Sequence, residues 1–183
     1  MLSSSAASAT PHRIKPSSDS RHQHMSTSDA PLPEAPQVPG APPKILAITA
    51  PYYQNVVEGM LGAARDILAK TNSTLEIVEV AGAFELPQAL AIVADARTDF
   101  DGYIALGCVV RGETDHYEFV CTSAMDGLMR VAVEHRLCLG TGLLTVDTLT
   151  QAMARSRETG ANKGAEAAVA CLKQIALKRG FMS

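Results

Sequence analysis

The residues best suited to chemistry lie together in one stretch, Gly107 to Tyr117, where glycine, threonine, charged residues and a histidine follow an apolar run. The apolar run, Tyr103 to Val110, is typical of a buried parallel strand, and residues 113–115 favour the start of a helix. Free backbone N–H groups and the positive end of the dipole at a helix start bind anions such as phosphate. We therefore predict a phosphate site in the turn after this strand.

A titratable side chain, that of His116, follows this predicted phosphate site directly. Imidazole transfers protons near neutral pH, so a phosphate ester held beside it suits general acid–base catalysis. The alternative is a turn that binds nothing and a histidine that is an ordinary surface residue, because strand–glycine–helix turns are common in α/β proteins. This stretch alone does not decide between the two interpretations.

The composition excludes several classes of protein. The chain has 183 residues, a formal net charge of −3 and no tryptophan, and it shows no long basic run beyond its first residues. This length suits one domain with a tail, and neither the charge nor the few aromatic residues suit nucleic acid. No apolar stretch reaches the length of a membrane span. We expect no nucleic-acid or membrane partner.

The cysteines and remaining histidines indicate no metal site. The cysteines form no C-x-x-C pair and lie in apolar segments, as free thiols do in a reducing compartment. The histidines outside the central stretch do not stand at ligand spacing. These residues are Cys108, Cys121, Cys138, Cys171, His12, His22, His24 and His135. We expect no metal, no cofactor and a cytoplasmic protein.

Residues 1–43 differ in composition from residues 44–183, which we assign to a single domain. Serines give way to prolines and no aromatic residue occurs, so this segment cannot bury enough apolar surface to fold, and we predict a disordered tail. Its basic, acid-poor start also resembles an organellar transit peptide. A third interpretation makes Met25 the first residue. An unstructured extension or a start at Met25 is favoured over a transit peptide, because no amphipathic arginine-bearing helix is visible.

From Lys44 onward, short apolar runs alternate with segments of helical periodicity. Strands are predicted at 44–49, 75–80, 103–110 and 138–144, and helices at 56–68, 87–97, 116–135, 149–155 and from 162 onward, with Thr148 in the cap of the fourth. This alternation predicts an α/β fold, a three-layer sandwich whose four-stranded parallel sheet is flanked by helices. The unusual residues then meet at the carboxyl ends of the strands, where α/β proteins bind ligands.

Three motifs resemble the 6,7-dimethyl-8-ribityllumazine synthase family in order and spacing. They are Gly82–Pro87 (GAFELP), Gly107–Tyr117 (GCVVRGETDHY), and Gly160–Gly164 (GANKG) preceded by Arg155. The resemblance covers residues 44 to about 178 and implies a flavodoxin-like sandwich. It implies a transferase of riboflavin biosynthesis that condenses 5-amino-6-(D-ribitylamino)uracil with 3,4-dihydroxy-2-butanone 4-phosphate, releasing phosphate and water without a metal or cofactor.

The resemblance also implies roles for single residues. His116 matches the acid–base residue, and the phosphate-binding positions are Gly112, Glu113, Thr114 and Arg155, with the arginine coming from a neighbouring subunit. The positions that bind the pyrimidine and its ribityl chain are Tyr52, Ala83, Phe84, Glu85, Cys108, Val109, Val110 and, from the neighbour, Lys163. Tyr52 is preferred over Tyr53 as the stacking residue. As alternatives, Glu85 caps a helix, while Arg155 and Lys163 are ordinary surface charges.

Two positions depart from the family pattern. Ala81 stands where the first motif usually has proline, which loosens the turn but removes no functional group. Thr141 stands where the neighbour often supplies an aromatic residue, so stacking on that side is weaker. The departure at Thr141 bears on substrate affinity rather than on the reaction.

The resemblance implies a homopentamer with sites between neighbours, and it leaves open single pentamers, paired pentamers or a shell of twelve. Apolar surface predicted on the helix at 126–134 and on the alanine-rich last helix fits such an interface. Two other functions compete: a shell-forming or flavin-binding paralogue without activity, and an FMN carrier. The retained His116 and Arg155 argue against the first. The second needs a Ser/Thr-rich phosphate loop where the chain has Pro51 to Gln54.

Overall fold

A computed structural model describes residues 32–96, 99–158 and 160–182 of the chain. Its centre is a parallel sheet with the strand order β2-β1-β3-β4. The strands are β1 (Lys44–Ala50), β2 (Thr74–Glu79), β3 (Gly102–Val110) and β4 (Leu139–Val146). β1 and β3 lie in the middle of the sheet and their residues are almost all buried, which explains why both read as continuous apolar runs.

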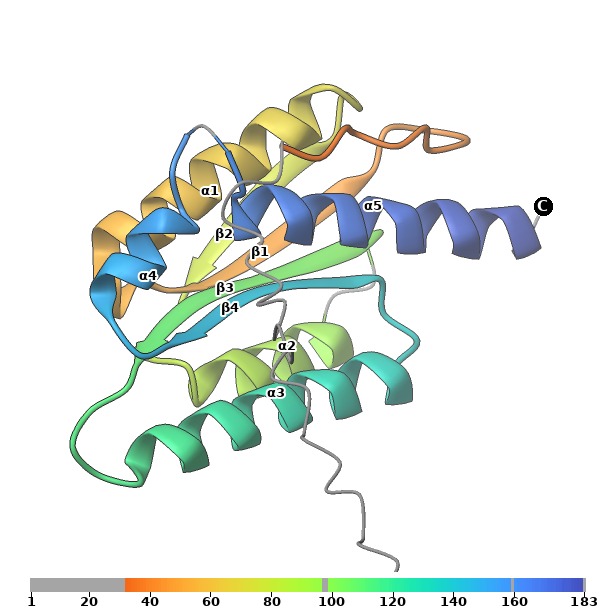
Figure 1. Ribbon diagram of the computed structural model, residues 1–183. Coiled ribbons are helices and arrows are strands. Elements are labelled where there is room, and N and C mark those ends of the chain that lie inside the picture. The colour runs from red at the N-terminus through yellow and green to blue at the C-terminus, as the bar shows by residue number, and fades with distance from the viewer. Residues whose placement is uncertain (1–31, 97–98, 159, 183) are drawn as a thin grey trace, which may run out of the picture.

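Helices cover both faces of the sheet (Figure 1). On one face lie α1 (Gln54–Ala69), α4 (Leu149–Ala154) and α5 (Lys163–Met182), and on the other lie α2 (Glu85–Ala96) and α3 (His116–Glu134). Each face has its own apolar core, one built with α1 and α5 and the other with α2 and α3. The predicted three-layer α/β sandwich with a four-stranded parallel sheet is confirmed.

The local signals for the helices mostly agree with the structure. The backbone N–H of Gln151 donates to Thr148 Oγ1 at 3.2 Å, so Thr148 caps α4 as predicted. Pro87 lies in the first turn of α2, where its missing N–H costs nothing. A short 3-10 turn, Pro51–Tyr53, joins β1 to α1 where we expected only a break. The predicted end of the second helix, Arg97, lies outside the described residues.

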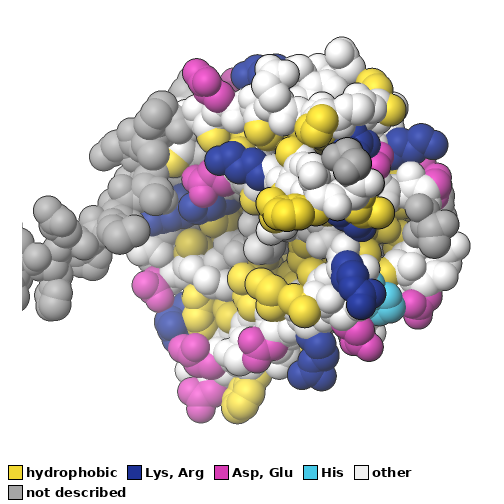
Figure 2. All heavy atoms as spheres, turned by 90° about the vertical axis from the view of Figure 1, so that its right-hand side faces the viewer, with side chains coloured by type: hydrophobic (Ala, Val, Ile, Leu, Met, Phe, Trp, Pro, Cys, Tyr) yellow, Lys and Arg dark blue, Asp and Glu magenta, His cyan; other side chains and the backbone are white. Residues whose placement is uncertain are grey.

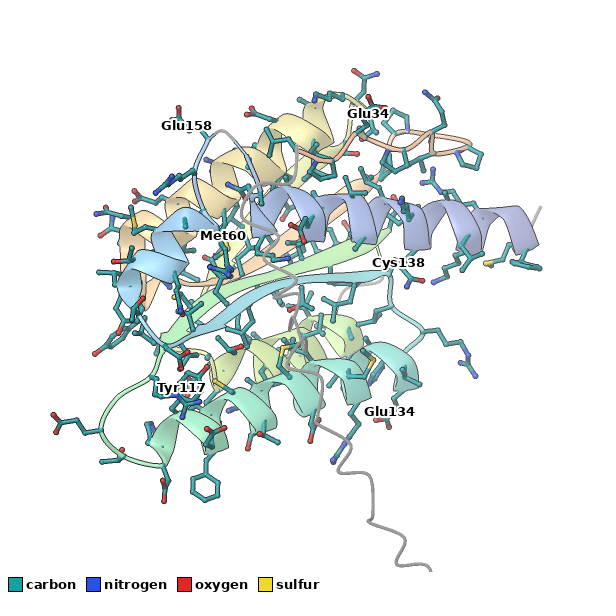
Figure 3. All side chains as sticks on the ribbon, viewed as in Figure 1. Glu34, Met60, Tyr117, Glu134, Cys138 and Glu158 are labelled. Atoms are coloured by element: carbon teal, nitrogen blue, oxygen red, sulfur yellow. The ribbon has the colours of Figure 1, made fainter. Side chains whose placement is uncertain are left out.

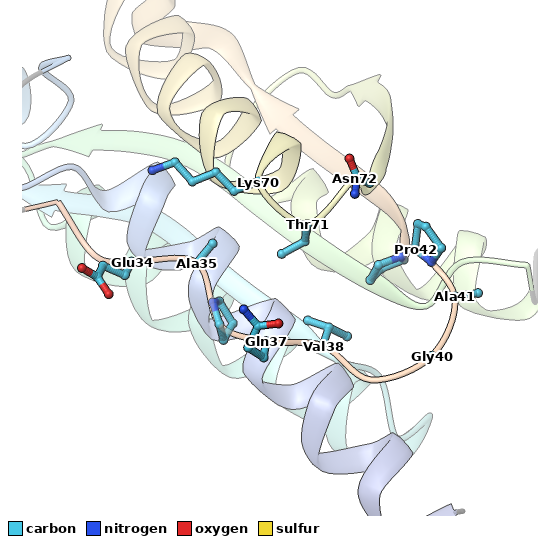
Figure 4. A pocket seen from close by; sticks show the side chains of 12 residues that line it. Glu34, Ala35, Gln37, Val38, Gly40, Ala41, Pro42, Lys70, Thr71 and Asn72 are labelled. Carbon is cyan, nitrogen blue, oxygen red and sulfur yellow. The ribbon is translucent and has the colours of Figure 1, made fainter.

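Residues 32–43, which we assigned to the tail, form no helix or strand but lie against the domain. Ala35 and Val38 pack on the α1–α5 core, and Arg179 Nη1 donates to the carbonyls of Pro39 and Ala41, both at 2.7 Å. This segment and the turn at 70–72 border a hollow of about 600 Å³ (Figure 4). The rest of the predicted tail, residues 1–31, lies outside the described residues.

Large apolar side chains remain exposed on several helices, among them α3 and the end of α5. On α3, Phe119, Met129 and Val133 are more than 60% exposed. The last helix also exposes apolar residues, although its alanine-rich first half is buried against α1 and β4. Its exposed apolar residues lie near its end instead, at 177 and 181–182. Figure 2 views the molecule from the end where α5 stops and shows hydrophobic side chains among charged ones. None of the described helices is long and apolar enough to span a membrane.

Candidate active site

A cavity of about 350 Å³ opens where the central strands end. The turns after β1, β2 and β3 and the start of α3 all border it, because parallel strands bring their carboxyl ends to one edge of the sheet. Its lining consists of Tyr52, Tyr53, Gly82, Ala83, Phe84, Glu85, Cys108, Val109, Val110, His116 and Val120. The cavity therefore brings together the predicted acid–base residue and the predicted pyrimidine-binding residues, apart from Lys163.

Two rings face this cavity from successive strand–helix connections. The centroids of the Phe84 and His116 rings lie 6.4 Å apart and the rings are tilted by 46°. Phe84 precedes the first residue of α2, and His116 is the first residue of α3. Both side chains are exposed in the single chain. A planar heterocycle lying against Phe84 would thus be within reach of the imidazole.

The two tyrosines after β1 differ in their surroundings. Tyr52 is 76% exposed, whereas Tyr53 packs against the α1–α5 core. Burial and the neighbouring Tyr52 raise the pKa of Tyr53 above its ordinary value. The two rings meet edge to face with centroids 5.2 Å apart. Tyr53 therefore holds the turn in place, and Tyr52 presents a free aromatic face at the cavity.

Cys108 is the buried thiol of this cavity. It is 5% exposed, and burial raises its pKa to about 11, with a smaller contribution from Cys121. A thiol with so high a pKa stays protonated at neutral pH and is a poor nucleophile. Cys108 therefore contributes shape and apolar surface to the cavity rather than covalent chemistry.

The predicted phosphate residues lie beside the cavity rather than in its lining. Gly112, Glu113 and Thr114 are exposed in the loop between β3 and α3. A Cβ at Gly112 would meet no atom within 4 Å, so there is open space at this point. The Asp115 side chain makes no capping hydrogen bond among the described residues. The start of α3 therefore has no side-chain cap from Asp115, an arrangement that suits anion binding there.

The remaining predicted residues lie on another part of the chain. The backbone N–H of Lys163 donates to the carbonyl of Arg155 at 2.9 Å, which holds these two residues together. Lys163 Nζ pairs with Glu166 at 2.5 Å, and Arg155 Nη1 donates to the carbonyl of Gln151 at 2.9 Å. Thr141 is exposed on the edge strand β4. Arg155, Lys163 and Thr141 do not line the cavity of their own chain.

Sequence reasoning missed several residues that shape the site. Gly82 and Val120 line the cavity without a predicted role, and Tyr53, the alternative to Tyr52 as the stacking residue, lines it as well. Asn162 is fully buried, and its side chain accepts from the N–H of Gly164 while donating to the carbonyls of Gly59 and Arg157. It therefore caps α5 and positions Lys163, a role that the cap-forming residue type in front of a helix could have indicated.

In the described part of the chain, no three His, Cys, Asp or Glu side chains come together as metal ligands would. All four cysteines are free. The site that the structure presents is instead an apolar cavity with an imidazole, a carboxylate and an aromatic face at its rim. Such a lining suits a planar organic substrate with polar substituents.

The fold and this cavity define an α/β enzyme whose site lies beyond the carboxyl ends of its strands. The sequence model of the 6,7-dimethyl-8-ribityllumazine synthase family matches residues 42–179. The 6,7-dimethyl-8-ribityllumazine synthase of Methylobacterium radiotolerans is 41% identical over 156 residues, 85% of this chain and 93% of its own. Those of Bartonella tribocorum and Paramagnetospirillum magneticum are both 40% identical, over 76% and 74% of this chain and 92% and 95% of their own.

The chain belongs to the 6,7-dimethyl-8-ribityllumazine synthase family. It is a lumazine synthase, an enzyme of riboflavin biosynthesis.

Proposed function

We propose that the cavity is one half of the lumazine synthase active site and that a neighbouring subunit supplies the other half. The observation that carries this proposal is the division of the predicted residues. His116 and all residues assigned to the pyrimidine except Lys163 border one cavity, whereas Arg155, Lys163 and Thr141 lie outside it on the same chain. In the proposed site, the two groups come from two neighbouring copies of the chain.

In this proposal the pyrimidine ring lies between Tyr52 and Phe84, over the apolar floor formed by residues 108–110. Glu85 accepts hydrogen bonds from ribityl hydroxyls, a task that suits a carboxylate at the rim. Ala83 leaves room for the heterocycle beside Phe84. Lys163 of the neighbour approaches from the open side of the cavity, next to Thr141.

The second substrate, 3,4-dihydroxy-2-butanone 4-phosphate, places its phosphate at the loop of residues 112–114. Backbone N–H groups at the start of α3 and the Thr114 hydroxyl donate to it, and Arg155 of the neighbour provides a bidentate partner. Its carbon skeleton then extends toward His116. Imine formation, loss of phosphate and ring closure each move a proton, and the imidazole serves as acid and base. Holding both substrates in this geometry supplies much of the acceleration.

A homopentamer is the smallest active assembly we propose; these rings either remain single, pair, or close into a shell. The exposed apolar residues of α3 and the end of α5 provide surface for contacts between copies. We further propose that the enzyme works in the cytoplasm, where its four free cysteines stay reduced. We propose no metal or organic cofactor for the reaction.

The direct test follows lumazine formation by absorbance after the purified chain is mixed with both substrates. Product that depends on both substrates is expected. Absence of product at every substrate concentration, from protein that is folded and assembled, would contradict the proposal and favour the inactive binding paralogue. Bound FMN without product would favour the carrier function instead.

A further inference from the structure

We propose that Arg111 is a positioning residue, which braces the loop of residues 112–115 and the start of α3 and so sets where the phosphate and His116 meet. This inference rests on the proposed function and adds to it a residue that neither substrate needs to touch. The brace is defined here as Arg111 with its two carboxylate partners, Glu118 and Asp147.

The brace joins three elements at the carboxyl end of the sheet. Arg111 directly follows β3, and its backbone N–H donates to the carbonyl of Val146 at 2.8 Å, which extends the β3–β4 ladder by one step. Arg111 Nε donates to Asp147 Oδ1 at 2.9 Å, just after β4. Arg111 Nη1 donates to Glu118 Oε1 at 2.7 Å, in the first turn of α3. One planar guanidinium therefore ties two strand ends to a helix start.

The same guanidinium also covers the residue that follows His116. Its central carbon lies 4.2 Å from the centroid of the Tyr117 ring, and Tyr117 is 9% exposed. Figure 3 shows Tyr117 at the start of α3, beside the loop that leaves β3. Arg111 thus contacts both residues after His116 and begins the loop before it. The Arg111 side chain therefore connects the start of segment 112–116 to the residues that follow its end.

These contacts of Arg111 matter because little else fixes the position of the loop of residues 112–115. Residues 111–116 are all exposed, and the Asp115 side chain caps nothing in the described structure. A loop that must present N–H groups to a phosphate and an imidazole to the carbon skeleton has to be fixed from outside. The guanidinium fork suits this task better than an ammonium group, because it can bind two carboxylates in fixed directions.

The geometry separates this role from that of a phosphate ligand. Two of the three guanidinium nitrogens, Nε and Nη1, already donate to carboxylates. If Arg111 bound the phosphate directly, the affinity for phosphate would fall only when the arginine itself is replaced. If Arg111 acts as a brace, removing Glu118 and Asp147 should weaken phosphate binding as well. Removal of these two negative charges would otherwise be expected to strengthen it.

The experiment uses the full-length, assembled protein and measures turnover, both KM values and inhibition by inorganic phosphate. Arg111→Met keeps the aliphatic stem and removes the donors. We expect it to lower turnover about tenfold and raise the KM of the phosphate substrate about tenfold, with a change of less than about twofold in the KM of the pyrimidine. Inhibition by inorganic phosphate should weaken in parallel. Arg111→Lys should fall between, because it keeps charge without the fork.

The decisive variant is Glu118→Ala combined with Asp147→Ala, which should change turnover and phosphate KM in the same direction as Arg111→Met. Its matched control, Glu58→Ala combined with Asp66→Ala, removes the same charge from exposed positions of α1 and should leave both values unchanged. If the carboxylate variant behaves like the wild type while Arg111→Met does not, Arg111 is a phosphate ligand and the brace is wrong.

Two further outcomes would overturn the brace. One is unchanged kinetics in Arg111→Met. The other is a lower melting temperature with both KM values moved equally, which a purely structural role would give. Thr114→Val tests the proposed phosphate loop separately. If it leaves the phosphate KM unchanged, that loop assignment fails, and the brace is then judged by its effect on turnover through His116.

Discussion

The imidazole of His116 and the ring of Phe84 lie 6.4 Å apart, centroid to centroid, at the rim of one cavity, although one begins α3 and the other directly precedes α2 on the same face of the sheet. This relationship places a proton-transfer group next to the surface against which a heterocycle would lie. The His116 side chain is exposed, so it can be removed without disturbing the core.

His116→Ala is therefore expected to lower turnover by about 10- to 1000-fold while the fold survives, because one general acid–base group contributes on that scale. Steady-state assays and a melting curve check the two halves of this statement. His135→Ala, at the opposite end of α3, is the matched control and should leave turnover unchanged. Equal activity in His116→Ala and the wild type would mean that water or substrate moves the protons.

Arg155→Ala is expected to raise the KM of the phosphate substrate by at least about tenfold and that of the pyrimidine much less, because a charge-assisted bidentate contact would be lost. Arg157→Ala, an exposed arginine two residues away, serves as the control. Comparable increases in both KM values for Arg155→Ala would show that this residue shapes the subunit contact rather than binding phosphate.

The sheet and the cavity follow from the sequence because their signals are local. The central strands are continuous apolar runs, the long helices show periodic apolar residues, and the topology of a parallel sheet then brings the loop motifs to one edge. The position of Phe84 near His116 could be anticipated in this way. The family resemblance supplied the individual roles, which local patterns do not specify.

What the sequence did not indicate depends on contacts between distant segments. The pairing of Arg111 with Asp147 joins the ends of two strands, and no spacing rule predicts it. Gly164 belongs to one of the sequence motifs, but the motif does not explain why glycine is needed there. In the structure, a Cβ at this position would overlap the carbonyl of Met60. The contact of Arg179 with residues 39–41 is likewise invisible in composition, which marked that segment only as proline-rich.

The buried thiol of Cys108 leads to a prediction about pH. Its pKa is raised from 9.0 to about 11 in the folded chain, so above pH 9 the unfolded chain releases a proton that the folded chain retains. The free energy of unfolding must then fall as pH rises from about 9 through 11, and this contribution is fully present only below that range. Urea unfolding across this range should show the decline.

Cys108→Ala provides the control for this pH dependence, since only the contribution of that thiol is removed. Its free energy of unfolding should decline less steeply between pH 9 and 11 than that of the wild type, whatever its absolute stability. Parallel curves for the two proteins would show that the thiol titrates normally in the folded chain.

The last prediction concerns the division of the site between subunits. His116→Ala chains retain an intact Arg155, and Arg155→Ala chains retain an intact His116. If each site takes His116 from one chain and Arg155 from the next, random mixing of equal amounts restores about a quarter of the interfaces in a ring. Denaturing the two variants, mixing them and refolding them together should therefore recover activity that neither variant shows when it is refolded alone.

Mass measurements must first establish that mixed rings have formed, and a mixture prepared without denaturation serves as the control for exchange. Recovery in the refolded sample but not in the unexchanged one places the two residues on different chains of one site. Mixed rings without any recovered activity would show instead that His116 and Arg155 act within a single chain. Because Arg155 and Lys163 do not line the cavity of their own chain, that result would require a rearrangement of α4 and the start of α5 on substrate binding.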